Sequence, residues 1–552
     1  MASLLEARRE QMFPKLTAAQ LRRLEAYGTK TRIRAPEVLS ESGDRYGGML
    51  VVLSGAVEIV RPGLSGEEAI VVHTPGDFSG EISSLRGSGS FVRMRVREDG
   101  EVIAISHDNL RRLVQSDAEL SELFMRAFIL RRMGLIGAEG GDIILIGSRD
   151  CPGTHRVQQF LDRNALPHAR IDADMDPDVA ALLERFHVGL GDLPVVICRG
   201  EHVLRKPGNQ EIAACLRMNA QLDDAVVHDL VVIGAGPAGL AAAVYAASEG
   251  LRVLVLETLG PGGQAGASSK IENYLGFPTG ISGGALAGRA LVQAQKFGAE
   301  VMVAGTAVRL RNEQRPYAIE LEGGRTVRAR TIIIATGAEY RSLALENLTR
   351  FLGVGVYYAA THLEAQLCGD EEVIVVGGGN SAGQAAVFLA RGCRHVHLIV
   401  RSSGLADSMS QYLIQRIEES ANITLHPWTE VAALEGGARL ERVTWRTGAE
   451  KQAETLGIKH VFLMTGAVPN THWLEAALAL DERGFVRTGT SLAAADLESW
   501  RWPLSRPPHL LETSLPGIFA VGDVRSGSVK RVAAAVGEGS ACVQFVHGAL
   551  QE

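Results

Sequence analysis

The stretch Asp229-Leu-Val-Val-Ile-Gly-Ala-Gly-Pro-Ala-Gly239 opens the pattern that decides the fold of the larger part of the chain. Its apolar first half predicts a buried strand, and residues 240–250 (LAAAVYAASEG) predict the helix that follows. Residues 251–257 (LRVLVLE) are apolar again and predict a second strand. Strand, glycine-rich turn, helix and strand in this order are typical of a dinucleotide-binding unit.

The glycines of this turn have separate tasks. Gly234 permits the tight turn, Gly236 lets the backbone approach a pyrophosphate, and Gly239 permits close packing of the helix. Glu257 ends the second strand, where its carboxylate can accept a hydrogen bond from a ribose hydroxyl. Because all these features are in register, the pattern predicts a bound dinucleotide.

A second unit of the same kind follows. Residues 371–377 (EEVIVVG) predict its strand, and the turn reads Gly377-Gly-Gly-Asn-Ser-Ala382, whose last residue is small enough for close packing. No acid stands at the end of the next strand, residues 395–400. Arg401 follows instead and offers a cation for a 2′-phosphate, so NADPH is favoured over NADH. Two dinucleotide sites in one chain predict an oxidoreductase with a tightly held flavin and an exchangeable nicotinamide.

The composition is that of a multidomain globular protein. The chain has 552 residues, 46% hydrophobic and 22% charged, which suggests three or four domains. Its 56 Lys+Arg and 63 Asp+Glu give a net charge of −7, so we expect no nucleic-acid partner. The apolar stretch 229–247 is broken by glycines and a proline, so we expect no membrane span. The six cysteines show no C-x-x-C spacing, which predicts no metal site and a reducing, cytoplasmic location.

Two further zones precede the dinucleotide-binding part. Residues 32–105 alternate short β-rich runs with glycine and aspartate turns, which predicts a small β-barrel with helical flanks. Residues 142–218 alternate three strands with three helices and predict a compact α/β unit. We expect the two domains at residues 1–138 and 139–222.

The last part of the chain, about Asp229 to Leu550, resembles the low-molecular-weight thioredoxin reductases. The matching motifs occur in order: the first fingerprint, Gly262-Gly-Gln264, residues 271–278 (IENYLGFP), Ala335-Thr-Gly337, residues 377–382 (GGGNSA), Gly466-Ala-Val-Pro-Asn470, residues 517–524 (GIFAVGDV) and Lys530-Arg-Val-Ala533. The resemblance implies a homodimer with a discontinuous FAD-binding domain at residues 226–341 and 466–552. It implies an NAD(P)H-binding domain at residues 342–465, inserted between these two parts.

The resemblance also implies which residues contact the two cofactors, FAD and NADPH. The residues expected at FAD are Gly234, Gly236, Pro237, Ala238, Gly239, Glu257, Gly263, Gln264, Asn273, Ala335, Thr336, Gly337, Gly522, Asp523, Arg531, Val532 and Ala533. Among them, Asp523 can accept a hydrogen bond from a ribityl hydroxyl. The residues expected at NADPH are Gly377, Gly379, Asn380, Ser381, Ala382 and Arg401.

The chain departs from this family at the redox centre. The family carries a C-x-x-C beside the flavin, and the aligned residues 353–368 (GVGVYYAATHLEAQLC) have Ala359 and His362 at those positions. Disulfide exchange needs a thiolate, so we expect that this module does not run the family's disulfide relay. His362 is a candidate proton donor at the flavin, with a packing histidine as the alternative. Of the family's three arginines in the nicotinamide loop only Arg401 is kept, which weakens the 2′-phosphate site.

The 139–222 domain resembles the glutaredoxin or thioredoxin fold, with Cys151-Pro-Gly-Thr154 at a helix N-terminus and Leu193-Pro194 before a later strand. Pro194 is expected in cis beside Cys151, and the helix N-terminus is expected to lower the pKa of the thiol. Thr154 replaces the second cysteine, so Cys151 can form a mixed disulfide but no internal one. Cys151 is therefore a candidate monothiol, and the alternative is an adaptor without chemistry. The fusion is similar in layout to the alkyl hydroperoxide reductase flavoprotein.

The N-terminal domain resembles the cyclic-nucleotide-binding β-roll, on residues 43–60 (GDRYGGMLVVLSGAVEIV) and Phe78-Ser-Gly80-Glu81-Ile82. The resemblance implies that Glu81 binds the ribose 2′-hydroxyl and that Gly80 lies near the cyclic phosphate. The family's Arg-Ser/Thr-Ala sequence, which neutralises this phosphate, does not occur here, and Arg86 or Arg93 would have to replace it. The alternative is a β-roll that mediates dimer contacts and binds no nucleotide.

Together these features predict an α/β fold, with two Rossmann-like three-layer dinucleotide-binding domains preceded by a β-roll and a thioredoxin-fold domain. The expected chemistry is hydride transfer from NAD(P)H to FAD and onward to an unidentified acceptor: a thioredoxin-like protein, a ferredoxin or flavodoxin, or a small molecule. The alternatives are a ferredoxin- or flavodoxin-NADP reductase and an FAD-binding redox sensor with little turnover. Residues 500–508 (WRWPLSRPP) are expected to form a surface loop, or else a partner site.

Overall fold

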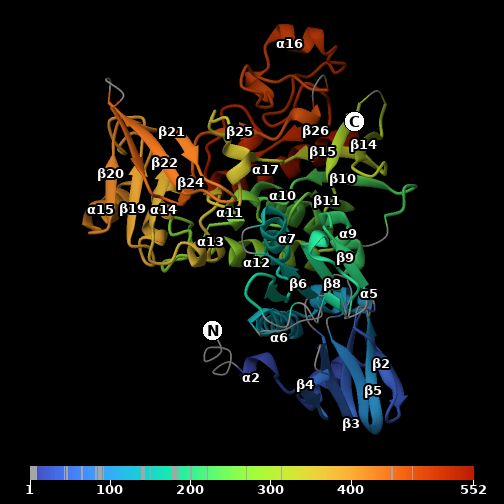
Figure 1. Cartoon of the computed structure of the whole chain (residues 1–552). Helices are drawn as coiled ribbons and strands as arrows, with labels where there is room; N and C mark the ends of the chain where they lie inside the picture. Colours follow the sequence, from blue (N-terminus) through green and yellow to red (C-terminus); the bar gives the residue numbers. More distant parts are fainter. Residues whose placement is uncertain are drawn as a thin grey trace.

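The structure is a computed structural model of the whole chain, in which four groups of elements follow one another (Figure 1). It describes residues 9–42, 44, 48–63, 66–80, 84, 90, 92–137, 143–148, 151–176, 179, 183–184, 186–198, 202–219, 222–268, 270–312, 314–448, 452–474 and 477–552. The N-terminal group, blue in Figure 1, lies at one end of the molecule, and the group drawn mainly in orange lies to one side.

The N-terminal group is an antiparallel β-roll flanked by helices. Its elements are α2 (Arg9–Met12), α3 (Ala18–Leu24), β1 (Thr29–Ile33), β2 (Val38–Ser40), β3 (Gly48–Gly63), β4 (Gly66–His73), β5 (Arg93–Ser106), α5 (His107–Ser116) and α6 (Ala118–Gly137). β5 pairs with β1, β2 and β3, and β3 also pairs with β4. Phe124 and Phe128 of α6 are fully buried against Phe78, and this aromatic cluster anchors the helix to the roll. The expected β-barrel with helical flanks is confirmed.

The second group is built on a four-stranded mixed sheet. Its elements are β6 (Ile143–Gly147), α7 (Pro152–Arg163), β7 (Ala169–Asp172), η1 (Leu190–Asp192), β8 (Val195–Cys198), β9 (His202–Arg205) and α9 (Asn209–Cys215). The strand order is β7-β6-β8-β9, with β6 parallel to β7 and antiparallel to β8. The Leu193–Pro194 peptide bond is cis, as expected. The second expected helix, residues 176–186, lies mostly outside the described residues, and the thioredoxin fold stays a prediction.

The third group, hereafter the FAD unit, carries the first fingerprint. Its strand order is β12-β11-β10-β15-β14-β13, and β26 also pairs with β15. The strands are β10 (Val227–Ile233), β11 (Val253–Glu257), β12 (Glu300–Val303), β13 (Ala307–Arg311), β14 (Tyr317–Leu321), β15 (Thr326–Ile334) and β26 (Ile518–Ala520). The helices are α10 (Pro237–Ser248), α11 (Gly263–Gly266), α12 (Gly283–Lys296), α16 (Ala494–Ser499) and α17 (Val532–Gln551), with short turns η3 (His472–Leu474), η4 (Gly489–Ser491) and η5 (Gly522–Val524). Helices α10, α12 and α17 share one buried core with the sheet.

The fourth group, hereafter the NADPH unit, carries the second fingerprint on a parallel sheet of order β17-β24-β18-β19-β20. The elements of this layer are η2 (Leu348–Phe351), β17 (Val356–Tyr357), α13 (His362–Leu367), β18 (Glu372–Val376), α14 (Asn380–Leu389), β19 (His395–Ile399), α15 (Gln411–Glu419), β20 (Ile423–His426) and β24 (His460–Leu463). An antiparallel sheet of β21 (Thr429–Glu435), β22 (Arg442–Thr447) and β23 (Gln452–Leu456) packs on one face, while α14 and α15 pack on the other. The expected doubly wound α/β architecture is confirmed.

Two short strands join these dinucleotide-binding units. β16 (Ala338–Tyr340) leads out of the FAD unit and β25 (Ala467–Pro469) leads back, and the two pair antiparallel. Arg341 N donates to Gly466 O at 2.6 Å beside this pair. The connection therefore consists of two hydrogen-bonded strands that together position one unit against the other.

The two N-terminal groups share their cores with the FAD unit. Val292 of α12 is buried in the core of the β-roll, and Gln115 Nε2 donates to Lys296 O at 3.0 Å. Val303 is buried in the core of the four-stranded unit, and its backbone pairs with the Asn219 side chain at 2.6 and 2.8 Å. Both N-terminal units are thus packed on the FAD unit through apolar and polar contacts together.

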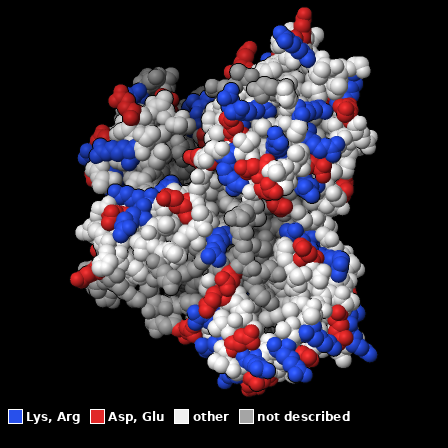
Figure 2. All heavy atoms as spheres, turned by 90° about the vertical axis from the view of Figure 1, so that its right-hand side faces the viewer, with Lys and Arg blue, Asp and Glu red and all other residues white. Residues whose placement is uncertain are grey.

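Charged side chains of both signs are interspersed over the face shown in Figure 2. Among the helices that the structure describes, none is long and apolar enough to cross a bilayer. None of the six cysteines, all of which lie among the described residues, forms a disulfide bond. Within the same described residues, no three His, Cys, Asp or Glu side chains are grouped so that they could hold a metal ion.

Candidate functional site

Two glycine-rich loops of the FAD unit meet at the end of β10. Gly234 has φ +105°, and a Cβ added there would lie 2.3 Å from Ala335 O in the loop after β15. A Cβ on Gly239 would lie 1.9 Å from Gly234 O, so only glycine lets α10 begin this close to the turn. The tight turn and the close helix packing expected of these two glycines are both present.

Glu257 holds the same turn together through its carboxylate. Its Oε2 accepts from Ala235 N at 2.7 Å, and its Oε1 accepts from Leu259 N at 2.9 Å and Gly260 N at 3.1 Å. A carboxylate offers about four acceptor positions. One position therefore remains for a ribose hydroxyl, while the other three fix the orientation of the side chain.

The loop that contains Gly262 and Gly263 lies against the first turn. Gly262 N donates to Ala235 O at 2.8 Å. A Cβ on Gly263 would lie 3.2 Å from Gly236 Cα, and a Cβ on Gly236 would have no neighbour nearer than 4.0 Å. Both loops thus present backbone without side chains where they meet, which is the surface that a pyrophosphate needs for close approach.

A third, C-terminal loop, which contains Gly522, lies beside the two glycine-rich loops. Gly522 has φ +73°, and its added Cβ would lie 3.0 Å from the Cβ of Ala238 at the start of α10. Burial raises the pKa of the adjacent Asp523. Lys530 Nζ donates to Asp523 O at 3.0 Å and so ties the loop to the approach to α17. The arrangement places a half-buried carboxyl group beside the first turn, as a ribityl acceptor requires.

The other residues expected at FAD differ in exposure. Thr336 Oγ1 donates to Asn470 O at 2.9 Å, and Asn470 Nδ2 donates to Thr336 O at 3.0 Å, which fixes the second loop. Ala238 and Ala335 are buried, Pro237, Gly337 and Val532 are half-buried, and Gln264, Asn273, Arg531 and Ala533 are exposed. The loops around the proposed dinucleotide thus bring together residues far apart in sequence.

The turn of the NADPH unit repeats this design. Gly377 has φ +140°, and its added Cβ would lie 2.2 Å from Met464 O, whereas a Cβ on Gly379 would have no neighbour within 4 Å. Ala382 is fully buried, as close helix packing requires. Asn380 Oδ1 accepts from Ser410 N at 2.7 Å, so its side chain also fixes the loop before α15. Arg401 is exposed, and the described residues offer it no ion pair.

Tyr340 contacts the turn of the NADPH unit. Its side chain forms a hydrogen bond with Ser381 of the second turn, and the charge of Asp523 in the first site acts on it. Burial is the main cause that raises the pKa of Tyr340. The nicotinamide-binding turn thus lies within electrostatic range of the C-terminal loop of the FAD unit. Tyr340 was not among the expected site residues, and only its position shortly after Gly337 could have indicated it.

The residues present fit the two cofactors that the fingerprints imply. Bare backbone at Gly236 and Gly263, an oriented acceptor at Glu257 and a half-buried Asp523 suit the diphosphate, ribose and ribityl groups of FAD. The open approach to Gly379 and the exposed cation Arg401 suit a nicotinamide dinucleotide phosphate.

Residues 353–368, which the resemblance aligns with the family's dithiol, contain a buried acid. Glu364 of α13 is 1% exposed, accepts from Thr361 N at 2.8 Å, and lies 3.6 Å from His155 Nε2 of α7. Burial raises the pKa of Glu364, but the bonds from His155 and Thr361 outweigh it and hold the pKa below its ordinary value. His362 is the first residue of α13, and its side chain lies outside the described part of the structure, so its role as a proton donor stays a prediction.

Cys151 is the N-cap residue of α7 and is half-buried. A Cβ added to Gly153 would lie 3.1 Å from Pro194 Cδ and 3.6 Å from Cys151 Sγ, so Pro194 borders the thiol as expected. One turn further along α7, the His155 ring packs against Tyr357 with a centroid separation of 6.0 Å. Helix α7 therefore contacts the NADPH unit through His155, one turn away from Cys151.

The expected nucleotide site of the β-roll is described only in part. Gly80 has φ +109°, and its carbonyl accepts from Arg131 Nη1 at 2.8 Å. Glu81 and Arg86 lie outside the described residues. Arg93 forms ion pairs with Glu41 and Glu67, so it would have to leave both acids to reach a phosphate.

Comparison with known proteins identifies the family. The profile of the pyridine nucleotide-disulphide oxidoreductases matches residues 228–539, which is more than half of the chain. The chain belongs to this family. A second profile, that of the cyclic nucleotide-binding domain, matches residues 30–117 of this oxidoreductase and confirms the resemblance of its β-roll.

The relatives narrow the group further. The thioredoxin reductase of Mycolicibacterium smegmatis is 32% identical over 316 residues, which cover 57% of this chain and 94% of that protein. That of Bacillus subtilis is 32% identical over 330 residues, 59% of this chain and 96% of that protein. A solved structure, Lactococcus lactis thioredoxin reductase in its FR conformation, is similar with a TM-score of 0.53 at 27% identity, covering 59% of this chain and 99% of that one. This oxidoreductase is a thioredoxin reductase-like flavoprotein, of a family that uses FAD and NADPH.

Proposed function

We propose that this oxidoreductase takes hydride from NADPH onto FAD and passes the electrons to an acceptor other than a dithiol of its own FAD and NADPH units. The observation that supports the proposal is Tyr340, which forms a hydrogen bond with Ser381 of the second turn and lies near enough to Asp523 of the FAD unit for that charge to act on it. When bound, FAD would accept a hydride and release electrons one or two at a time. Ala359 and His362 stand where the family's cysteines would take these electrons.

The residues of the chain have separate tasks in this function. The backbone around Gly236 and Gly263 would hold the FAD diphosphate, Glu257 the ribose, and Asp523 the ribityl chain. The turn from Gly377 to Ala382 would hold the NADPH diphosphate. The remaining expected contacts, from Gln264 and Asn273 to Arg531 and Ala533, and the homodimer implied by the resemblance, are part of the same proposal.

An anaerobic titration of the purified yellow protein tests the function. We expect NADPH to bleach the visible flavin absorbance, and NADH to do so only at higher concentration. Arg401→Ala should remove this preference by weakening NADPH binding about tenfold, because a charge-assisted bond to the 2′-phosphate is lost. The exposed Arg391 of the same unit provides a control, and Arg391→Ala should titrate like the wild type. If the purified protein held flavin but neither NADPH nor NADH bleached it, only the alternative of an FAD-binding redox sensor with little turnover would remain.

A second candidate acceptor is a disulfide on Cys151. The observation that favours it is the docking of α7 on the NADPH unit, through His155 and Glu364, beside the segment that lacks the dithiol. A mixed disulfide between Cys151 and a small thiol would take up two electrons and two protons and give the Cys151 thiol and the free small thiol.

Substitution of Cys151 shows whether a disulfide on this cysteine is the acceptor. If Cys151 is the acceptor, Cys151→Ser abolishes NADPH-dependent reduction of a small-molecule disulfide while bleaching of the flavin by NADPH is unchanged. Cys215→Ser, at a half-buried cysteine of the same unit, should leave both reactions intact. Equal disulfide turnover in Cys151→Ser and the wild type would eliminate this candidate and leave the first one standing.

A further inference from the structure

The C-terminal end of α7 reaches the FAD loop from a different domain. Asn164 Nδ2 donates to Leu259 O at 2.9 Å, and Arg163 Nη1 donates to Gly263 O at 3.3 Å. A Cβ added to Gly260 would lie 2.9 Å from Arg163 Cβ. The helix therefore ends directly on the loop that connects β11 with α11, and Gly260 leaves room for it.

Arg163 is an unusual cation for such a place. It is half-buried, and burial lowers the pKa of its guanidinium. It forms no ion pair among the residues that the structure describes, and its one described hydrogen bond is to the Gly263 carbonyl. A guanidinium has five N–H donors, and a desolvated charge without an anion is costly. The arrangement predicts an anionic partner that is not a side chain of the described chain.

The acids that act on Arg163 are already engaged. Glu257 and Glu364 both stabilise its charge from a distance. The oxygens of Glu257 accept from backbone amides, among them Ala235 N, and Glu364 is bound by Thr361 and His155. Neither carboxylate is free to turn toward the guanidinium.

We propose that Arg163 of the second unit binds the diphosphate of FAD across the domain boundary. It lies on the loop in which Gly263 and Gly236 face each other with bare backbone, and a guanidinium matches two phosphate oxygens with parallel hydrogen bonds. The unit that carries Cys151 thereby supplies part of the FAD site. This inference rests on the proposed function, because it needs FAD at the first fingerprint.

The affinity of the holoprotein for FAD tests this assignment. Dilution of the yellow protein releases FAD, and the rise of free flavin fluorescence gives its dissociation constant. Arg163→Met should weaken FAD binding about 10- to 100-fold, as expected for loss of a charge-assisted bond, and Arg163→Lys should restore part of it. The matched control is Arg156→Met, at an exposed arginine of the same helix that donates to Pro207 O at 2.8 Å, and it should bind FAD like the wild type.

Four outcomes decide the question. Weaker FAD binding in Arg163→Met, with the thermal unfolding temperature of the FAD-free protein unchanged, supports the assignment. Equal affinities for Arg163→Met and Arg156→Met overturn it, and so does a loss of FAD that is matched by unfolding of the FAD-free protein and not reversed in Arg163→Lys. A wild-type protein that holds no FAD would instead refute the proposed function itself.

Discussion

Gly234→Ala is expected to yield a protein that has lost most of its flavin. The new Cβ would lie 2.3 Å from Ala335 O and 2.8 Å from Ala335 C, both backbone atoms of the second FAD loop. Overpacking costs about 1–3 kcal/mol, and the left-handed φ of +105° adds about 1–2 kcal/mol. The loops can relieve this only by moving apart, so FAD affinity should fall about 10- to 100-fold.

The ratio of visible to ultraviolet absorbance of the purified protein measures this loss. Gly250→Ala is the matched control, because Gly250 also has a positive φ of +89° but its added Cβ would meet nothing within 4 Å. It should lose some stability and keep its flavin. If the two variants retained equal flavin, the contact between the first turn and the Ala335 loop would not be what shapes the site.

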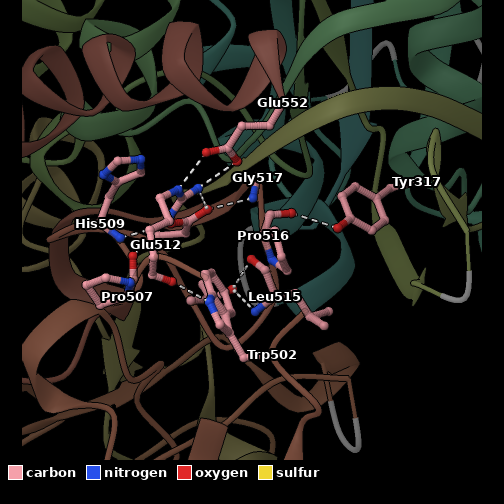
Figure 3. A network of polar contacts seen from close by, with 11 residues as sticks. Tyr317, Trp502, Pro507, His509, Glu512, Leu515, Pro516, Gly517 and Glu552 are labelled. Atoms are coloured by element: carbon pink, nitrogen blue, oxygen red, sulfur yellow. Dashed lines mark hydrogen bonds and ion pairs between the residues drawn. The ribbon is translucent and has the colours of Figure 1, made fainter. Parts of the chain in front are cut away.

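Glu512→Gln is expected to destabilise the fold by about 3 kcal/mol, because it removes a fully buried charge from its partners. Glu512 is 0% exposed. Its Oε2 accepts from Arg506 Nη1 at 2.7 Å and from His509 N at 2.9 Å, and its Oε1 accepts from Gly517 N at 2.8 Å (Figure 3). An amide would turn an N–H donor toward one of these donors, and Glu552 would remain as the only carboxylate that pairs with Arg506 among the described residues.

Urea unfolding measures this loss of stability. If the unfolding free energy depends equally steeply on urea concentration in both proteins, the shift of the midpoint gives the difference between their free energies of unfolding. Glu498→Gln is the control, since Glu498 lies on α16 in the same region and is exposed. It should unfold at the urea concentration of the wild type. A Glu512→Gln protein with that same midpoint would show that the network in Figure 3 adds nothing to stability.

The local pattern of the sequence was enough for the two fingerprints. The expected strand, helix and strand of residues 229–257 correspond to β10 (Val227–Ile233), α10 (Pro237–Ser248) and β11 (Val253–Glu257), with shifts of a few residues at the ends. The reason is physical: apolar runs, glycine turns and a terminal acid all act within about thirty residues, so their signal is contained in the chain itself.

Contacts between domains could not be predicted in this way. Arg163 with Gly263 and His155 with Glu364 join helices and loops that a local pattern does not connect. Residues 500–508 illustrate the same limit: they form the expected irregular loop with exposed or half-buried side chains, but the sequence did not reveal what this loop binds. Within this loop Arg506 binds the buried Glu512, and Trp502 Nε1 donates to Arg506 O at 2.7 Å. An arginine among prolines has no periodicity that would reveal its partner.

Val292 gives α12 two roles at once. It is one of the FAD unit's own residues, yet it is buried with Leu113 and Phe124 in the β-roll. Removal of the β-roll would therefore expose an apolar patch on α12 to water.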